Sequence, residues 1–192
     1  TGASTYTGAT TLFTGILDVG ASGLSNSNLA FNGGVLQTTT ATAFTRSLGT
    51  GAGQVQFGTD GGGFAARTAA LTVNIGGASS TLIWNSTANF LGNGASLVLG
   101  SASANSTVTF ENGIDLKGGA RTITALGATG TQRISGAISD PVTGGSLVKS
   151  GAGALRLSGA NTYAGATTVK EGALMLGSST GSLNSATDLT FT

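Results

Sequence analysis

Two stretches of this sequence repeat each other. Residues 2–20 read GASTYTGATTLFTGILDVG and residues 159–177 read GANTYAGATTVKEGALMLG, so that 11 of 19 positions are identical at an offset of 157. Tyr6 and Tyr163, the two tyrosines of the chain, fall at equivalent positions. Self-similarity at a fixed offset is the sequence signature of repeat architectures. We therefore predict that residues 1–192 form one repetitive segment. It holds one full unit, whose length equals the offset of 157 residues, and the start of the next unit.

The sequence around and between the repeats favours strands over helices. Glycine takes 34 positions, and each interior glycine costs a helix about 1 kcal/mol relative to alanine. Short runs rich in Val, Ile, Leu, Thr and Phe are instead closed by Gly, Asn or Ser, which is typical of strands. The runs expected to be strands are 28–31, 54–57, 71–75, 81–84, 97–99, 107–110, 114–116, 121–124, 133–134, 147–149, 155–157, 168–170 and 174–176.

The expected strands are very short, and two-residue hairpin signals are few. Asn112-Gly113 and Asp60-Gly61 are examples. Leu99, Thr124, Lys149 and Leu174 are spaced by 25 in the numbering, each within or at the end of an apolar run. A coil of roughly 20–30 residues suits three short strands with their turns. We therefore predict an all-β fold, a parallel β-helix or solenoid with rungs of roughly 25 residues.

Residues 21–95 keep this spacing less well, and we expect longer turns there, around 38–44 and 60–64. In the repeated region the alternation of apolar and polar residues predicts a core that contains Leu155, Leu157, Val169, Leu174 and Leu176.

The repeated stretches also predict particular turns. Gly8, Gly15, Gly165 and Gly172 stand where the chain must bend, and we expect positive φ angles there. Asn161 is expected either in a left-handed turn or with its amide stacked on an asparagine of the next rung. Because their neighbours are small, Tyr6 and Tyr163 are expected to cap the core.

Residues 145–176 resemble a known family. They read GSLVKSGAGALRLSGANTYAGATTVKEGALML, which is similar to the autotransporter-associated β-strand repeat from Leu147 to Leu174. The first copy, from Gly2 to Leu17, matches the second half of the pattern, with Ser4 in place of the usual asparagine. The resemblance implies a right-handed parallel β-helix, export through an outer membrane, and a role as a stalk or in assisting export. It brings no catalytic residues.

Composition excludes several classes of function. Eight basic residues are offset by seven acidic ones, which leaves no electrostatic footprint for nucleic acid. Histidine and cysteine are absent, which removes Ser-His-Asp and Cys-His catalysis, zinc sites of the His/Cys kind, and disulfides. No run approaches the roughly 18 apolar residues of a membrane span, so we expect no membrane insertion of this segment. We expect no cofactor.

Polysaccharide-cleaving enzymes need paired carboxylates, and the closest acids here are Glu111 and Asp115. We expect both to be solvated turn residues. Lys149, Arg156 and Lys170 alternate with apolar residues, so we expect them to face outward. No catalytic, cofactor-binding or metal-binding residue is predicted.

Two further patterns have simpler interpretations. Residues 58–63 read GTDGGG, which weakly resembles a calcium-binding nonapeptide but lacks a second turn. Trp84 with Phe90 could form a platform on which a sugar stacks, although a large core filler is favoured.

The sequence predicts a non-catalytic β-helical stalk or scaffold of a large exported bacterial protein, at the cell surface of a Gram-negative-type organism, with assistance of passenger export as an added role. The expected partners are neighbouring repeats of the same polypeptide, with head-to-tail or lateral self-association open. The alternatives are the building block of a self-associating extracellular filament or sheath, and an adhesin that binds a glycan or host protein. An enzyme is not expected.

Overall fold

The structure is a computed structural model that describes residues 5–20, 24, 26–40, 42–77, 80–127, 129–142, 144–177, 183 and 188–192. Ser4 lies outside these residues. Within them there are 20 strands and no helix. The strands are β1 (Thr10–Leu12), β2 (Ile16–Val19), β3 (Leu29–Phe31), β4 (Val35–Thr38), β5 (Ala43–Arg46), β6 (Val55–Phe57), β7 (Gly61–Ala66), β8 (Leu71–Ile75), β9 (Leu82–Ile83), β10 (Ser96–Leu99), β11 (Val108–Phe110), β12 (Ile114–Asp115), β13 (Ala120–Ala125), β14 (Thr131–Ile134), β15 (Ile138–Ser139), β16 (Ser146–Ser150), β17 (Ala154–Leu157), β18 (Thr167–Val169), β19 (Ala173–Leu176) and β20 (Leu189–Phe191).

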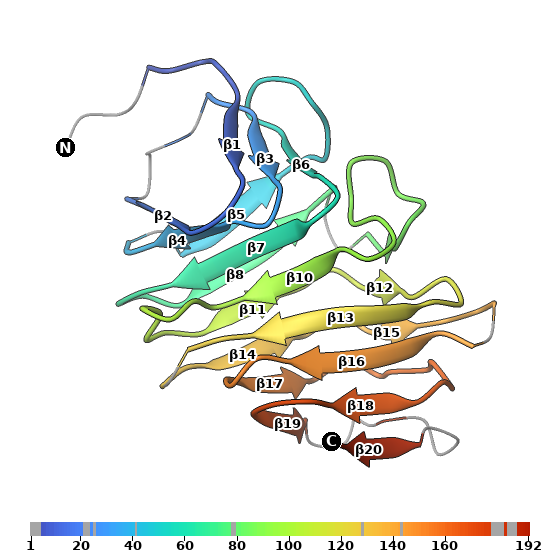
Figure 1. Ribbon diagram of the computed structural model, residues 1–192. Coiled ribbons are helices and arrows are strands. Elements are labelled where there is room, and N and C mark those ends of the chain that lie inside the picture. Colours follow the sequence, from blue (N-terminus) through green and yellow to red (C-terminus); the bar gives the residue numbers. More distant parts are fainter. Residues whose placement is uncertain are drawn as a thin grey trace.

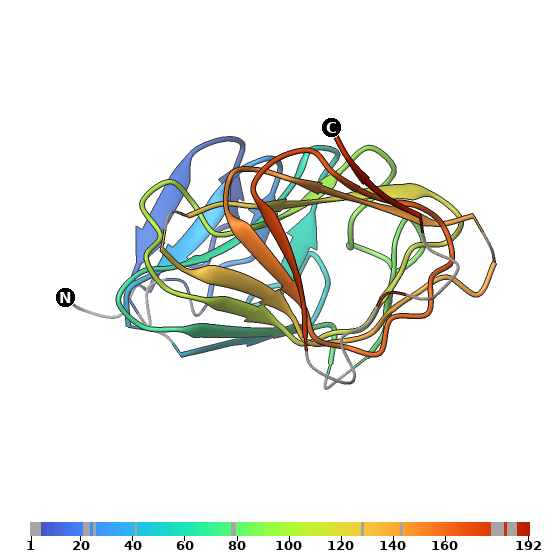
Figure 2. The same ribbon diagram turned by 90° about the horizontal axis from the view of Figure 1, so that it is seen from below.

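All strand pairs are parallel, and the strands form four sheets that wrap around one interior (Figures 1 and 2). The front sheet has the order β2-β4-β7-β10-β13-β16-β18-β20, and the back sheet has the order β19-β17-β14-β11-β8-β5. The third side is made by an upper side sheet, β1-β3-β6, and a lower side sheet, β15-β12-β9. Following the chain from front to back to side and again to the front traces a parallel β-helix, as predicted. The residues described contain no helix long and apolar enough to cross a membrane.

The coils differ in length, and the predicted spacing of 25 is off by one in the middle of the molecule. Leu99 pairs with Ala125 rather than with Thr124, so the numbering advances by 26 over this coil. Near the C-terminal end Lys149 pairs with Val169, an advance of only 20, and not with Leu174. The regular spacing in the sequence is therefore close to the true coil length without marking the true register, because turns of different lengths separate the strands.

Alternation along each strand explains which side chains form the core. In β8, Leu71, Val73 and Ile75 are buried, whereas Thr72 and Asn74 are only partly covered. Parallel pairing keeps this alternation in step from coil to coil. On the back sheet the inward residues Val73, Phe110 and Ile134 lie in one column. Residues of successive strands in such a column pack at the strand spacing of about 4.8 Å.

The core is aromatic in the N-terminal half and aliphatic in the C-terminal half. Phe31 and Phe57 stack with their ring centroids 5.0 Å apart, and Phe57 meets Phe90 edge-on at 5.7 Å. The numbering advances by 28 where Val35 pairs with Gly63, and such longer coils enclose the volume that these rings fill. The C-terminal coils are shorter and are filled mainly by the buried side chains Ile123, Ile134, Ile138, Leu147, Leu155 and Leu157.

Thr39, Thr40 and Thr42 lie in a turn between β4 and β5, as expected near residues 38–44, whereas the turn expected near residues 60–64 is instead largely strand. Residues Ala43–Arg46 form β5, and Gly61–Ala66 form β7. Gly61 and Gly62 have φ angles of +72° and +128°, and a Cβ atom added to Gly61 would lie 2.2 Å from the carbonyl oxygen of Ser96. The glycine run is therefore required by the close approach of neighbouring backbone.

The predicted core of the repeated region is correct for Leu155, Leu157 and Val169, which are buried. Leu174 is half-buried, and Leu176 is 45% exposed. Both point inward, paired with Leu155 and Leu157 of the preceding coil. They are open to solvent because they lie on β19, the last strand of the back sheet.

Candidate functional surfaces

The two acids considered as a catalytic pair do not share an open site. Glu111 is exposed after β11 of the back sheet, whereas Asp115 is buried in β12 of the lower side sheet. Oδ1 of Asp115 accepts a hydrogen bond of 2.8 Å from the backbone N–H of Lys117. The expectation that both are solvated turn residues is therefore wrong for Asp115. Its carboxylate holds the turn after β12.

A buried arginine, which was not predicted, lies near the same turn. Arg121 is 5% exposed, and its Nε donates to the carbonyl oxygen of Leu116 at 2.8 Å. Its Nη1 donates to Oδ1 of Asn93 at 2.6 Å. Burial lowers the pKa of Arg121, and the charge of Asp140 opposes that shift. Alternation along β13 is the signal that could have placed it, because Arg121 has the same parity as the inward residue Ile123.

Asp140 completes this arrangement by binding backbone rather than by facing solvent. Its Oδ1 accepts a hydrogen bond from the N–H of Gly118 at 2.8 Å, and its Oδ2 accepts one from the N–H of Gly145 at 2.5 Å. Asp140 is 9% exposed. The carboxylate therefore joins the turns of two successive coils. Such a carboxylate is a structural brace, since both oxygens are occupied.

Lys149 was predicted to face outward and is instead fully buried. It stands in the inward column of the front sheet, between Ile123 and Val169. Its Nζ donates hydrogen bonds to the carbonyl oxygens of Gly151 and Glu171, the latter at 2.8 Å. Burial lowers the pKa of Lys149, and the nearby charge of Glu171 acts in the opposite direction. The expectation of outward charge is correct for Arg156 and Lys170, which are exposed.

Buried amide side chains hold the corners of the coil. Oδ1 of Asn161 accepts a hydrogen bond from the N–H of Ile138 in the preceding coil at 3.0 Å. Asn112 makes the same kind of link, since its Oδ1 accepts the N–H of Ile75 at 2.8 Å. Asn161 has no positive φ angle, so the expectation of a left-handed turn is wrong. Stacking on an asparagine of the next rung stays a prediction, because Asn184 lies outside the described residues.

The aromatic pair considered as a sugar platform belongs to the core. Trp84 is fully buried, and its ring centroid lies 5.9 Å from that of Phe90. The indole Nε1 donates to the carbonyl oxygen of Gly92 at 2.9 Å. Phe90 is 5% exposed. Neither ring has a free face for a sugar, so the core-filler interpretation is correct.

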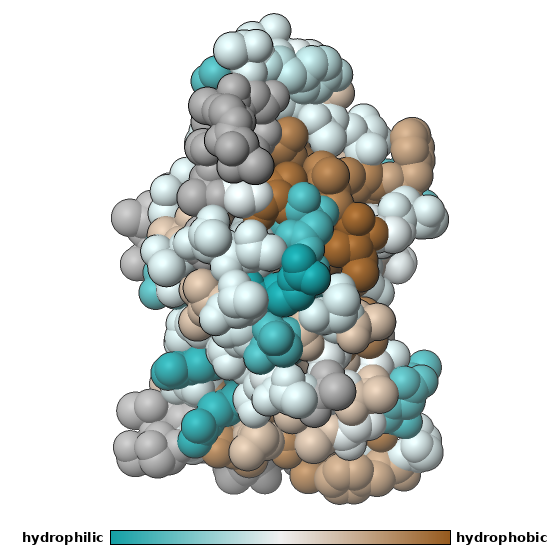
Figure 3. All heavy atoms as spheres, turned by 90° about the vertical axis from the view of Figure 1, so that its left-hand side faces the viewer, coloured by the Kyte–Doolittle hydropathy of each residue, from teal (hydrophilic) through white to brown (hydrophobic). Residues whose placement is uncertain are grey.

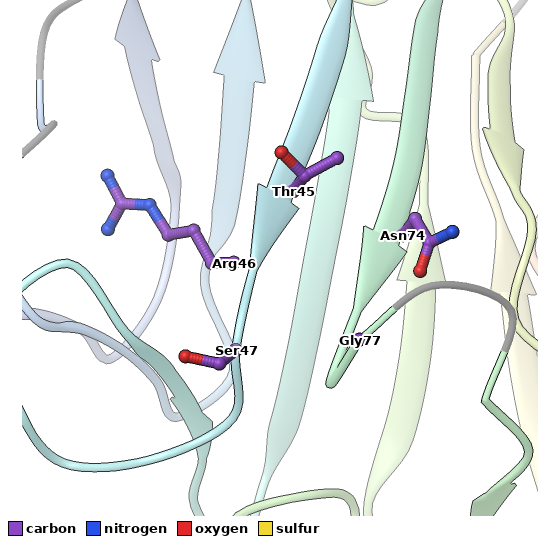
Figure 4. A pocket seen from close by; sticks show the side chains of 5 residues that line it. All are labelled: Thr45, Arg46, Ser47, Asn74 and Gly77. Carbon is purple, nitrogen blue, oxygen red and sulfur yellow. The ribbon is translucent and has the colours of Figure 1, made fainter.

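A pocket of about 240 Å³ lies beside β5 and β8 (Figure 4). It is lined by Thr45, Arg46, Ser47, Asn74 and Gly77. Nη1 of Arg46 donates to the carbonyl oxygen of Ser27 at 2.9 Å, and Nη2 donates to that of Leu24. The guanidinium is therefore used to fasten the segment before β3. Figure 4 shows it pointing away from Asn74 and Gly77.

The largest exposed apolar side chains lie mainly at the two ends of the stack. Leu189 and Phe191 of β20 are 47% and 70% exposed, and at the other end Phe13 and Ile16 are 65% and 44% exposed. Figure 3 shows apolar residues gathered along the lower end, where β19 and β20 lie. Leu189 and Phe191 stand in inward columns of the front sheet and, among the residues described, have no strand beyond them. Ile16 stands instead in the outward column of Val35.

The two repeat copies build the same local structure on different sides of the coil. β1 and β18 start at positions separated by the repeat offset of 157, as do β2 and β19. The glycine between the strands has a φ angle of +77° at Gly15 and +67° at Gly172. However, β1 and β2 lie in the upper side sheet and the front sheet, whereas β18 and β19 lie in the front and back sheets.

The other two turn glycines differ from expectation, because neither Gly8 nor Gly165 has a positive φ angle. A Cβ atom on Gly165 would lie 2.2 Å from the carbonyl oxygen of Gly145. Close packing of coils, rather than backbone handedness, therefore requires glycine at position 165.

Comparison with known families identifies these elements. Two segments match the passenger-associated-transport-repeat. They are residues 1–19 and 147–176, which end at equivalent positions of the two copies. The second match covers β16 to β19, and the first covers β1 and β2. No curated protein and no solved structure matches the chain. The match confirms the resemblance to the repeat of autotransporter passengers.

The transport repeat is a structural family, and its matched residues have structural tasks here. Tyr163, Lys149 and Asn161 are all within the second match, and each is buried with hydrogen bonds that connect neighbouring elements. In the described part of the chain, no three acidic side chains form a group that could hold a metal ion.

Proposed function

We propose that this chain is a non-catalytic coil segment of a large exported bacterial surface protein, in which it extends or carries the rest of the passenger. The observation that carries the proposal is that the transport repeats are part of one continuous stack of coils. The front sheet runs without interruption from β2, within the first repeat, to β18, within the second. Each coil contacts its neighbours and adds about 4.8 Å along the stack.

The proposal extends to export through an outer membrane to the cell surface of a Gram-negative-type bacterium. Coils that form one after another at the outer surface would bury apolar area as the chain emerges, and this would oppose backward movement. The absence of cysteine suits a chain that crosses a membrane unfolded, because no disulfide can form before the crossing.

The test removes one unit, residues 1–157, in frame from the gene of the full-length protein. We expect the displayed rod to shorten by roughly 30 Å, since the front sheet advances by six strands of about 4.8 Å from β2 to β18. Electron microscopy of the surface gives the length, and protease accessibility in whole cells gives the amount displayed. Loss of an enzymatic activity, with rod length and display unchanged, would overturn the proposal.

A building block of an extracellular filament is the second candidate, and the exposed apolar ends favour it. Leu176, Leu189 and Phe191 are exposed at one end, and Phe13 and Ile16 are exposed just before and on β2, the end strand of the front sheet at the other. Imaging of the native protein distinguishes the two functions, because a filament exceeds the length of one polypeptide. A glycan array addresses the remaining adhesin alternative.

A further inference from the structure

The second repeat shows how the sequence of the first repeat behaves when a coil precedes it. β18 pairs with β16 so that Val148 lies opposite Thr168, and β19 pairs with β17 so that Leu155 lies opposite Leu174. The N–H of Lys170 donates to the carbonyl oxygen of Lys149 at 2.9 Å. The second repeat is thus fastened to residues 146–157 by backbone and side chains together.

The first repeat has the same strands but presents the corresponding edge to solvent. β1 and β2 are the end strands of their sheets. The N–H of Thr10 donates to the carbonyl oxygen of Asn28, just as that of Thr167 donates to Asp188, so both strands use the same side to bind the following coil. By the offset of 157, Phe13 holds the place of Lys170. An open strand edge is a template for pairing.

The two repeat copies lie on different sides of the coil, and this difference sets the geometry of such pairing. One repeat unit runs from β1 to its equivalent, β18. The chain first passes from β1 in the upper side sheet to β2 in the front sheet, which is one side of the coil, and the front sheet then advances by six strands from β2 to β18. One repeat unit therefore spans six turns of the coil and one further side. If a preceding unit is stacked on this one in the same way, its β16 pairs with β1 as β16 pairs with β18 within the chain. The front sheet of the preceding unit then continues into the upper side sheet of the next unit.

We propose that the edge formed by β1 and β2 is a docking surface for the last coil, residues 134–157, of a preceding copy of this unit, and that successive units are rotated by one side of the coil. This inference rests on the proposed function as a coil segment. It adds that a surface feature, such as the pocket beside β5, appears on a different side in each unit and returns to the same side after three units. A ligand or partner bound there would be displayed around the rod rather than along one line.

The test uses a chain in which a copy of residues 134–157 is joined directly in front of Thr1. The chain has no cysteine, so one cysteine replaces Val148 in the added coil and another replaces Thr11, the equivalent of Thr168. Residues opposite each other in adjacent strands lie within the Cα separation that a disulfide requires. We expect this bridge to form as readily as the control bridge between V148C and T168C in the original chain.

The competing geometry stacks front sheet on front sheet without rotation. It keeps the column of the front sheet in which Val148 stands level with Thr122, Ser96 and Gly61. That column reaches the start of β2, so this geometry places the cysteine of the added coil beside Thr14→Cys and away from Thr11→Cys. A bridge to position 14, or failure of both bridges while the control bridge forms, overturns the inference. A second measurement, on the extended chain without cysteines, is hydrogen exchange at the amide of Phe13, which we expect to slow at least tenfold. Unchanged exchange there also overturns it, while the deletion test of the coil-segment function is unaffected.

Discussion

Tyr6 and Tyr163 occupy the same place in two copies of one repeat, yet the first is 54% exposed and the second is fully buried. The expectation that both cap the core is therefore wrong for Tyr6, whose hydroxyl donates to the carbonyl oxygen of Ala9 at 3.1 Å. That of Tyr163 shares a hydrogen bond of 2.7 Å with Oγ1 of Thr167. The repeat encodes a strand, a glycine turn and a second strand, while burial depends on the coil that precedes it. This is how stability is distributed in quasi-one-dimensional proteins.

The largest expected difference between the copies comes from removing each tyrosine ring. Tyr163→Ala leaves a cavity in the core, and aromatic truncations of this kind cost about 3–5 kcal/mol of unfolding free energy. Tyr6→Ala removes an exposed ring and should change stability by less than about 0.5 kcal/mol. Denaturant unfolding of both variants measures the difference. Equal losses would show that the preceding coil is not what separates the two sites.

A second comparison sets buried Lys149 against exposed Lys170. Lys149→Ala leaves the carbonyl groups of Gly151 and Glu171 without their donor, and with the cavity this should cost about 2–3 kcal/mol. Lys170→Ala should cost less than about 0.5 kcal/mol. Thermal or denaturant unfolding provides the measurement, and a harmless Lys149→Ala would contradict a bonded ammonium in the core.

Lys149 also predicts a dependence on pH. Burial lowers its pKa in the folded state, so the unfolded chain binds more protons between that value and the ordinary pKa of 10.5. The contribution of Lys149 to the unfolding free energy should therefore rise with pH through this interval. The matched control is Lys149→Met, which keeps the length of the side chain and should lack this rise.

The parallel β-helix was predictable from the sequence because the repeat, the short apolar runs and the glycine-rich turns all indicate coils. The side chains within it were harder to place. Leu147 and Val148 are adjacent apolar residues, so alternation could begin from either one, and the wrong choice put Lys149 outside. Once Leu147 is taken as inward, Lys149 must be inward too.

The N-terminal half shows a different limit of prediction from the sequence. Strand β7 begins with three glycines, and local propensity marks such a run as a turn. It is a strand because the backbones of β4 and β10 pair with it on both sides. No local pattern contains that information. Coil lengths are equally hidden, since loops of any length between the strands leave the parallel pairing intact.

The ends of the stack provide a smaller effect, on association rather than folding. Leu176 and Phe191 are inward-column residues with nothing stacked beyond them among the residues described, so we expect concentration-dependent head-to-tail association. Leu176→Glu should raise the dissociation constant at least tenfold, which corresponds to about 1.4 kcal/mol. Val142→Glu, at a 63% exposed site in the turn after β15, is the matched control. Sedimentation that shows a monomer at every concentration would contradict the expectation.

The smallest expected difference returns to the hydroxyl groups of the two tyrosines. Tyr163→Phe loses the hydrogen bond to Thr167 and should be about 1 kcal/mol less stable near neutral pH, whereas Tyr6→Phe should be unchanged within about 0.5 kcal/mol. Burial raises the pKa of Tyr163 above its ordinary value of 10.0, while the bond to Thr167 opposes that shift.

Because the folded pKa is raised, the contribution of this hydroxyl is complete below pH 10 and is lost as the pH rises through the folded value. The stability of the original chain should therefore fall toward that of Tyr163→Phe in alkali. In Tyr6→Phe, Tyr163 is the remaining tyrosine, so tyrosinate absorbance reports it alone. A midpoint at or below pH 10 would mean that the ring of the second repeat is as open to water as that of the first, and the comparison between the copies would fail.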